Sequence, residues 1–344
     1  MYMVTIILGG QIGSEGKGKV SAYLSFEHEM SIRSGGPNSG HTVNYKNSSN
    51  VMQLIPCSFV NPNCLLAMSA GSLIIPKLIL KEITELNIAE NRILIDNNAG
   101  IIEERHIAAE KDMLKHLLST GKGVGFAHAD KALRKSDFRL AKDVPELQKY
   151  LATVEEIANN FIDNGKRVMI EGTQGFDLSV HHGHYPYVTS RDTTAGSFIG
   201  EVGISPRKVS NIVMVLRAYP IRASNGPLYN ETTWDNVTKS SGALREIKEV
   251  TSVTKRLRRV GLFDEELVEK SIRINRPTQI ALNFVDYLNS NDYKINNYSI
   301  LSDTSKKFID KIENLYNVPV TLIGTGPNVE DIIDLRSEKG VLHG

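Results

Sequence analysis

The sequence predicts an α/β fold in which helices cover both faces of a mainly parallel central sheet. Apolar runs rich in β-branched residues alternate with segments whose apolar residues recur at helical spacing, and this alternation is typical of parallel sheets. Three of the runs lead into glycine-rich loops, at 9–18, 172–175 and 324–326. Because parallel sheets bind ligands at the carboxyl ends of their strands, these loops predict where the site lies. We expect residues 1–344 to form one domain with mobile active-site loops.

Each expected element follows from its own pattern. Short apolar runs bounded by turn residues predict strands at 4–8, 65–68, 93–96, 167–171, 212–216, 279–285 and 320–323. Apolar residues at helical spacing predict helices at 17–30, 74–86, 103–118, 144–161, 265–273 and 305–316. Turn residues predict a loop at 34–41, and polar stretches predict mobile loops at 44–50 and 289–297.

Composition limits the classes of function. The formal net charge of +1 favours neither nucleic acid nor an anionic membrane as a partner. Cys57 and Cys64 are the only cysteines, and their spacing matches no common zinc or redox motif, which predicts free thiols in a reducing compartment. The start lacks the basic region of a signal peptide, and no apolar run reaches the roughly 18 residues of a membrane span. We expect a soluble, cytoplasmic protein.

The first glycine-rich loop has the composition of a phosphate-binding loop. It follows an apolar run and precedes a helix-like segment, so the helix amides would point at a bound anion. Lys17 and Lys19 add positive charge. The loop is not a Walker A motif, because Gln11 replaces its first glycine and Gly18 its Ser/Thr. Close approach to an anion is permitted by Gly10, Gly13, Gly16 and Gly18.

Two further loops carry polar groups suited to a nucleotide. The segment 34–42 places glycines around Asn38 and His41, and His41 could donate a hydrogen bond or a proton near neutral pH. An ordinary surface loop is the alternative. In 171–190, Gln174 and Thr189 can bond a base edge or a phosphate. The nearby histidines lack a carboxylate or cysteine that would complete a metal site, so we expect no metal at His181, His182 and His184.

Three more segments could bind anions. Residues 251–261 combine hydroxyls with several arginines, and arginine pairs bidentately with carboxylate or phosphate. A solvated basic turn is the alternative. The glycine-rich run 119–125, followed by Lys131 and Arg134, is a weaker candidate. Residues 324–327 could approach a base or form only a turn.

In this order, the motifs resemble those of the adenylosuccinate synthetase family over nearly the whole chain. The matching segments are 10–19, 35–42, 119–125, 171–175, 185–190, 193–196, 251–261 and 325–327. The resemblance implies phosphoryl transfer from a nucleoside triphosphate to the 6-oxygen of a purine nucleotide. Aspartate then displaces the phosphate at C6. A base removes the N1 proton, and Mg²⁺ and a histidine neutralise charge on the phosphoryl group.

The family's roles transfer by motif position. The resemblance gives the catalytic group as Ser14, Lys17 and His41. It places Mg²⁺ at Ser14 and Gly40. It implies triphosphate contacts at Ser14, Glu15, Gly16, Lys17, Gly18, Gly40, His41, Thr42, Arg258, Asp286, Gly324 and Gly326. It implies nucleotide monophosphate contacts at Ser14, Asn38, Thr120, Arg134, Gln174, Thr189 and Arg256. It implies an aspartate site at Thr251, Ser252, Val253, Thr254, Arg256 and Arg258. Arg134 would serve the neighbouring subunit's site, so a homodimer is expected.

Ser14 departs from the family pattern. It replaces the aspartate that acts as N1 base and Mg²⁺ ligand, and a serine hydroxyl is a poor base. Simple inactivation is one explanation, but the remaining motifs are intact. The base at N1 lies beside C2, which carries an amino group in guanine, so a shorter side chain makes room and can accept that group's hydrogen bond. The change resembles the bacteriophage branch of the family, the 2-aminoadenylosuccinate synthetases, which join aspartate to dGMP for diaminopurine deoxynucleotide synthesis.

A second departure concerns the phosphoryl donor. GTP-specific members carry a K-x-D element, but here Phe284 replaces its lysine while Asp286 remains, which favours ATP. We therefore expect a Mg²⁺-dependent ligase acting on dGMP, L-aspartate and ATP, in the host cytoplasm if a phage encodes it. The alternatives are an ordinary synthetase acting on IMP with GTP, and a nucleotide-binding regulator without catalysis.

Overall fold

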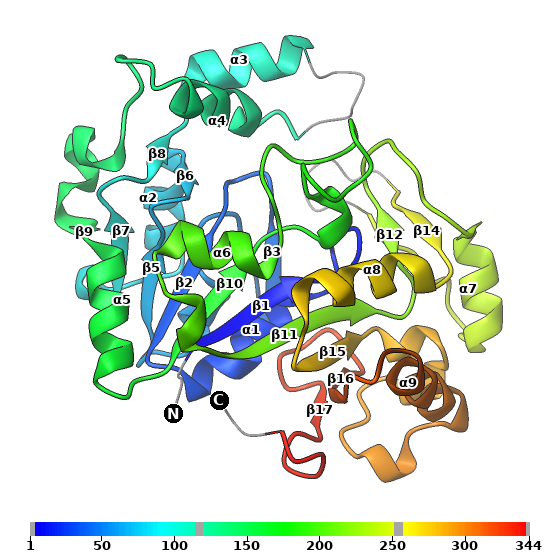
Figure 1. Ribbon diagram of the computed structural model, residues 1–344. Helices are drawn as coiled ribbons and strands as arrows, with labels where there is room; N and C mark the ends of the chain where they lie inside the picture. Colours follow the sequence, from blue (N-terminus) through cyan, green and yellow to red (C-terminus); the bar gives the residue numbers. More distant parts are fainter. Residues whose placement is uncertain (1–3, 114–119, 251–256, 342–344) are drawn as a thin grey trace.

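A ten-stranded sheet forms the centre of the molecule (Figure 1). The computed structural model describes residues 4–113, 120–250 and 257–341. The strand order is β17-β16-β15-β11-β1-β10-β2-β5-β7-β9, and each strand pair is parallel except β16 with β17. In sequence order the strands are β1 Val4–Gly9, β2 Met30–Ser34, β5 Leu65–Met68, β7 Ile93–Asp96, β9 Leu151–Ala152, β10 Val168–Gly172, β11 Val209–Arg217, β15 Gln279–Asn283, β16 Val320–Gly324 and β17 Ile332–Asp334. The expected mainly parallel sheet is confirmed.

Helices pack on both faces of this sheet. Alternate residues of a strand point to opposite faces, so Ile6 of β1 joins one apolar cluster and Ile7 joins another. The first cluster includes residues of α5, α6, α8 and α9, and the second includes residues of α1. The helices are α1 Lys17–Leu24, α2 Pro76–Glu85, α3 Glu104–Met113, α4 Val124–Ala132, α5 Val154–Asp163, α6 Ala195–Val202, α7 Trp234–Ser241, α8 Glu265–Asn275 and α9 Asp303–Tyr316. None of the helices within these described ranges could cross a membrane.

Small sheets stand beside the main one. The hairpin of β3 His41–Tyr45 and β4 Ser48–Met52 is antiparallel, and β6 Leu73–Ile74 pairs with β8 Gly100–Ile101. A three-stranded sheet joins β12 Ile221–Arg222, β14 Arg259–Gly261 and β13 Glu231–Thr232. The hairpin corrects the expected loop at 44–50: Lys46 and Asn47 have φ of 45° and 64°, the left-handed conformation of a tight hairpin turn.

Two expected helices were too long. The helix expected at 17–30 ends at Leu24, and β2 begins at Met30. The helix expected at 144–161 begins only at Val154, because Pro145–Tyr150 is a 3-10 helix and β9 follows it. Pro145 starts that short helix, where its missing N–H costs nothing. Of the helix expected at 103–118, residues 114–119 lie outside the described residues.

Candidate active site

The glycine-rich loops meet at one edge of the main sheet. The loops at 9–18, 34–41 and 172–175 follow the adjacent parallel strands β1, β2 and β10, so they lie together. A Cβ on Gly175 would lie 2.1 Å from the backbone nitrogen of Gly13, so the first and third loops touch through their backbones. The backbone N–H of Gln174 donates to Oγ of Ser39 at 3.3 Å, which joins the third loop to the second.

The loop at 9–18 is shaped from within by a buried carboxylate. Glu15 accepts backbone N–H bonds from Gln11 at 3.2 Å and from Gly13 at 2.7 Å. Its other oxygen lies 2.8 Å from Nζ of Lys17, with both side chains buried. The Glu15 side chain therefore holds the loop and Lys17 in place.

Ser14 lies at the exposed rim of the same loop. Its φ of 59° is in the left-handed region, which is uncommon for residues other than glycine. The residue is exposed, and its carbonyl oxygen accepts a hydrogen bond of 2.9 Å from Nη1 of Arg217. A hydroxyl thus faces the open side of a loop whose other polar groups are buried.

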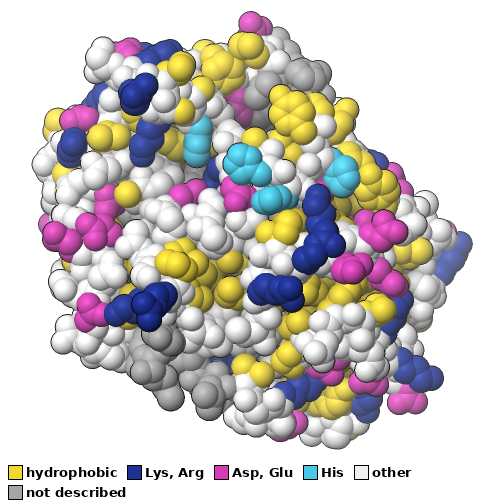
Figure 2. Space-filling model, in the orientation of Figure 1, with side chains coloured by type: hydrophobic (Ala, Val, Ile, Leu, Met, Phe, Trp, Pro, Cys, Tyr) yellow, Lys and Arg dark blue, Asp and Glu magenta, His cyan; other side chains and the backbone are white. Residues whose placement is uncertain are grey.

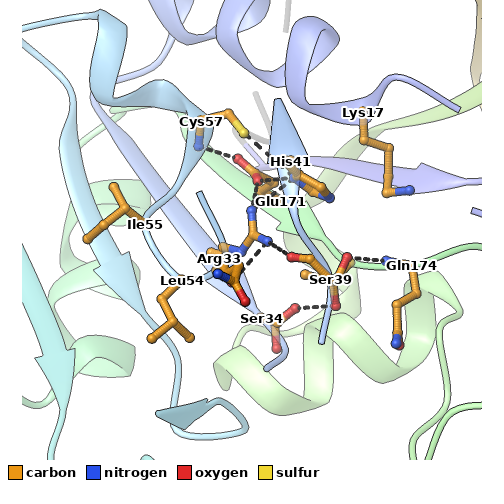
Figure 3. Close-up of polar contacts among 12 residues, drawn as sticks. Lys17, Arg33, Ser34, Ser39, His41, Leu54, Ile55, Cys57, Glu171 and Gln174 are labelled. Atoms are coloured by element: carbon orange, nitrogen blue, oxygen red, sulfur yellow. Dashed lines mark hydrogen bonds and ion pairs between the residues drawn. The ribbon is translucent and has the colours of Figure 1, made fainter. Parts of the chain in front are cut away.

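His41 belongs to a buried ion-pair cluster (Figure 3). Its Nδ1 lies 2.7 Å from Oε1 of Glu171, the same oxygen that Arg33 approaches at 2.5 Å. The other oxygen of Glu171 accepts the backbone N–H of Cys57 at 2.7 Å. A Cβ on Gly18 would lie 3.0 Å from Cβ of His41, so α1, which begins at Lys17, packs directly against the start of β3. Lys17 and His41 are therefore carried by two elements in contact.

The electrostatics of this cluster leave His41 neutral without a ligand. Burial and the charge of Arg33 lower the pKa of His41 to about 4. Burial alone would raise the pKa of Glu171, but Arg33 and the bond from His41 lower it to about 2. The Nδ1–H therefore donates to a carboxylate, while the buried Nε2 has no partner within the described residues. An anion at Nε2 would favour the protonated imidazole, whose charge Glu171 already compensates.

The same cluster contains three groups that could hold a metal ion. Ligand atoms of His41, Cys57 and Glu171 lie within 4.8 Å of one another, the one such group across the described ranges. However, Arg33 already pairs with Glu171, and burial raises the pKa of the Cys57 thiol well above its usual value. Because the Cys57 thiol is protonated and the Glu171 carboxylate is already paired with Arg33, this cluster is better suited to an ion pair than to a metal ion.

Three predicted nucleotide residues converge beside Ser39. Nδ2 of Asn38 donates to Oγ1 of Thr189 at 3.3 Å, and Gln174, whose backbone bonds Ser39, has φ of 67°. The Oε1 of Gln174 is buried and has no partner in the described part of the chain, so it is available to a donor on a ligand. Thr120 and Arg134 are exposed near the two ends of α4, and no described contact links them to this group.

The nearby histidine segment is held by protein partners. Figure 2 shows histidine side chains gathered near the middle of one face. Nδ1 of His184 lies 2.6 Å from Oδ1 of Asp177, and its Nε2 lies 3.1 Å from the hydroxyl of Tyr229. The ring of His182 stacks on Phe176 with centroids 6.0 Å apart.

The buried Lys19, which follows the first glycine-rich loop, contacts the glycine-rich loop at 324–326. Nζ of Lys19 donates to the carbonyls of Gly326 at 2.7 Å and Asp331 at 2.9 Å. Burial lowers the pKa of Lys19 to about 8, opposed by Asp286 and Asp331. Burial raises the pKa of Asp286 to about 7, opposed mainly by Lys19. Asp286 and Gly326, which are predicted to contact the nucleoside triphosphate, therefore both interact with the buried Lys19.

Comparison with known proteins places this arrangement in a family. The family model described as adenylosuccinate synthetase matches residues 6–142 and 138–295. The adenylosuccinate synthetase of Methanocaldococcus jannaschii is 45% identical over 343 residues, covering 97% of both chains. That of Archaeoglobus fulgidus is 40% identical over 341 residues, covering 97% of this chain and 99% of its own.

This chain belongs to the adenylosuccinate synthetase family. It is therefore a ligase that forms a C–N bond.

Solved structures share the fold. A fully ligated adenylosuccinate synthetase from Plasmodium falciparum superposes with a TM-score of 0.87 at 23% identity, covering 97% of this chain and 100% of that chain. The succinoaminodeoxyadenylate synthetase (PurZ) of cyanophage S-2L, bound to dGMP and to dATP as an energy donor, gives 0.83 at 26% identity, covering 99% and 98%. The resemblance inferred from the motifs is confirmed at the level of the family by the family model and the archaeal relatives.

The synthetase has site residues that the motifs did not indicate. Arg33 and Arg217 end or interrupt apolar strands and are buried, and a charge in such a strand is itself a signal of a buried ion pair. Arg217 and Arg258 share the carboxylate of Glu249. Five residues expected to bind aspartate or the nucleotide lie outside the described residues, namely Thr251, Ser252, Val253, Thr254 and Arg256.

Proposed function

We propose that this synthetase joins L-aspartate to C6 of dGMP with ATP. The products are N6-succinyl-2-amino-2'-deoxyadenylate, ADP and phosphate, which lead to diaminopurine deoxynucleotides. Ser14 carries the proposal, and the fold shared with the cyanophage enzyme, which was solved with dGMP, supports it. The archaeal relatives are adenylosuccinate synthetases, so IMP with GTP is the second candidate.

The backbone does not explain the serine at position 14. Aspartate tolerates a φ near 59° at least as well as serine does, so the choice must come from the side chain. The residue is exposed at the rim of the phosphate loop. A short hydroxyl there leaves space beside N1 of the purine and can accept the hydrogen bond of the guanine 2-amino group. Because the hydroxyl is a poor base, the N1 proton would leave to water at this open rim.

The transferred phosphoryl group would be stabilised from the buried side. Lys17 supplies a fixed positive charge at the start of α1. His41 presents Nε2, while Glu171 orients the ring and compensates the imidazolium that forms. Ser14 and Gly40 offer only neutral oxygens, which suit a Mg²⁺ ion bound mainly by phosphates and water. When bound, Mg²⁺ would neutralise phosphate charge.

ATP is the proposed phosphoryl donor. Phe284 has no ammonium group to offer a guanine, and its ring lies 4.0 Å from the guanidinium carbon of Arg217. Asp286, with its pKa raised to about 7, can donate a hydrogen bond when protonated, and adenine N1 is an acceptor. Arg134 is exposed after α4, and we propose that it reaches the nucleotide phosphate of a neighbouring subunit in a homodimer.

A phosphate-release assay tests the substrate. Purified enzyme is offered dGMP, GMP and IMP in turn, with L-aspartate, Mg²⁺ and either ATP or GTP. The highest kcat/KM is expected with dGMP and ATP, and the GMP arm measures the preference for deoxyribose. Turnover of IMP but not dGMP would contradict the proposal, and no turnover with any pair would favour a regulator.

A Ser14→Asp variant tests the steric argument. It should lose dGMP activity by about 100-fold or more, because the longer carboxylate collides with the 2-amino group. Ser49→Asp is the matched control, since Ser49 is an exposed serine on β4. Unchanged dGMP activity in Ser14→Asp would refute the role of the serine.

A further inference from the structure

Glu249 is shared between two arginines. One of its oxygens accepts from Nη2 of Arg217, and the other accepts from Nη1 of Arg258 at 3.1 Å. The backbone N–H of Arg258 also donates to the carbonyl of Glu249 at 2.9 Å. Although burial alone would raise it, the two guanidinium groups lower the pKa of the Glu249 carboxyl. One carboxylate therefore compensates two positive charges.

Arg217 connects this ion pair to the phosphate loop. Its Nη1 donates to the carbonyl of Ser14 at 2.9 Å. Its backbone N–H donates to Oε1 of Gln11 at 2.9 Å, and its carbonyl accepts from Nε2 of Gln11 at 3.2 Å. The side chain of Arg217 is fully buried, and its guanidinium stacks on Phe284. The fork geometry of arginine lets one group bond Ser14 and Glu249 together.

We propose that Arg217 and Glu249 form a positioning pair that sets the nucleotide preference at Ser14 and links it to Arg258. Ser14 holds a left-handed backbone conformation that a non-glycine residue adopts only when its surroundings impose it. The bond from Arg217 is that constraint. Glu249 fixes Arg217 from the opposite side and so ties Ser14 to Arg258. The nucleotide preference at Ser14 rests on the proposed function, and the role of Arg258 in binding aspartate is the one that the family resemblance implies.

A double-mutant cycle tests the pair. Arg217→Gln, Glu249→Gln and the double variant are compared for the ratio of the dissociation constants of dGMP and IMP, measured by calorimetry. Arg217→Gln should change this ratio about 10-fold and Glu249→Gln about 3-fold, while the double variant should match Arg217→Gln, as coupled residues do. Arg217→Lys keeps the charge but not the fork and should restore part of the ratio. Glu249→Gln should also raise the KM for aspartate.

The controls separate positioning from general damage. Glu246→Gln removes an exposed carboxylate three positions away, paired only with Lys248 at 2.7 Å in the described contacts, and should behave as wild type. A folding defect would weaken both nucleotides equally and leave their ratio unchanged. An unchanged ratio in folded Arg217→Gln, or single effects that multiply in the double variant, would overturn the proposal. A wild-type enzyme that prefers IMP would refute dGMP as the substrate. The double-mutant cycle would still measure the coupling between Arg217 and Glu249.

Discussion

The buried and exposed sides of the candidate site are built differently. Around His41, a carboxylate, a guanidinium and an imidazole lie within 3 Å of one another and are shielded from water. Around Ser14, the side chain is exposed and only the backbone is fixed. Lys17 and His41 on the buried side follow the family motifs, whereas Ser14 on the exposed side departs from them. This contrast supports the proposed function, in which phosphoryl transfer is retained and nucleotide choice is altered.

The largest effect is expected where the buried side loses its carboxylate. Glu171→Gln leaves the charge of Arg33 buried without its ion pair, so the free energy of unfolding should fall by about 3–5 kcal/mol. Glu231→Gln is the matched control, because its pair with Arg259 is exposed and should be worth less than about 1 kcal/mol. Urea unfolding of both variants measures the difference. Equal losses would show that burial does not distinguish the two pairs.

Removal of the imidazole should affect turnover more than stability. His41→Asn takes away the Nε2 that would face the phosphoryl group, so kcat should fall by about 10²–10³-fold. His181→Asn alters an exposed histidine and should leave kcat unchanged. Steady-state kinetics with saturating substrates give the comparison. A normal kcat in the His41→Asn enzyme would show that the buried His41 takes no part in phosphoryl transfer.

The stability of the protein should depend on pH through Asp286, at the predicted nucleoside triphosphate site. Burial raises the pKa of Asp286 in the folded protein to about 7 from its ordinary value of 3.8, so the folded state holds this proton more tightly. Stability from this group is therefore full below pH 3.8 and is lost as pH rises through 7. Relative to Asp286→Asn, wild type should lose on the order of 2 kcal/mol between pH 5 and pH 8. Chemical denaturation across this range measures it, with the exposed Asp235→Asn as control. If the difference in stability between wild type and Asp286→Asn does not change with pH, the pKa of Asp286 is not raised by burial.

The smallest effect is expected at the exposed rim itself. Ser14→Ala keeps the space but removes the acceptor for the guanine amino group. One hydrogen bond is worth about 1 kcal/mol, so the KM for dGMP should rise about fivefold more than the KM for IMP. An equal rise for both nucleotides would mean that the hydroxyl acts only on phosphate or Mg²⁺ and not on the base.

Local patterns predicted most strands of the main sheet but missed β2, β9 and β17. The strands at 65–68 and 93–96 were predicted to the residue because they are short runs that are apolar apart from Asp96. β2 was missed because Met30–Ser34 contains Arg33 and two serines. These polar residues are tolerated in the core because Arg33 meets Glu171, 138 positions away. The local sequence shows the charge of Arg33 in this segment but not the partner that compensates it.

The candidate site likewise contains residues that a local motif indicates and residues that no motif indicates. The motifs indicated Lys17, His41 and Gln174 because glycine-rich loops mark the strand ends where ligands bind. They gave no role to Arg217 and Glu249, whose partners lie 203 and 9 positions away in Ser14 and Arg258. Such residues act through other side chains, so only the three-dimensional arrangement brings them to attention.

The place of β1 in the sheet also determines when the protein can assemble. In the sheet, β1 lies between β10 and β11, with Val4 opposite both Val168 and Val209. The backbone N–H and C=O groups along both of its edges therefore remain unpaired for on the order of tens of seconds during synthesis, until those partners emerge. Long-range parallel pairing of this kind makes folding slow. A nascent chain that stops after α5 holds the phosphate loop at 9–18 without Gly175 and Arg217, which contact it in the folded protein, so we expect nucleotide binding only after β11 has been made.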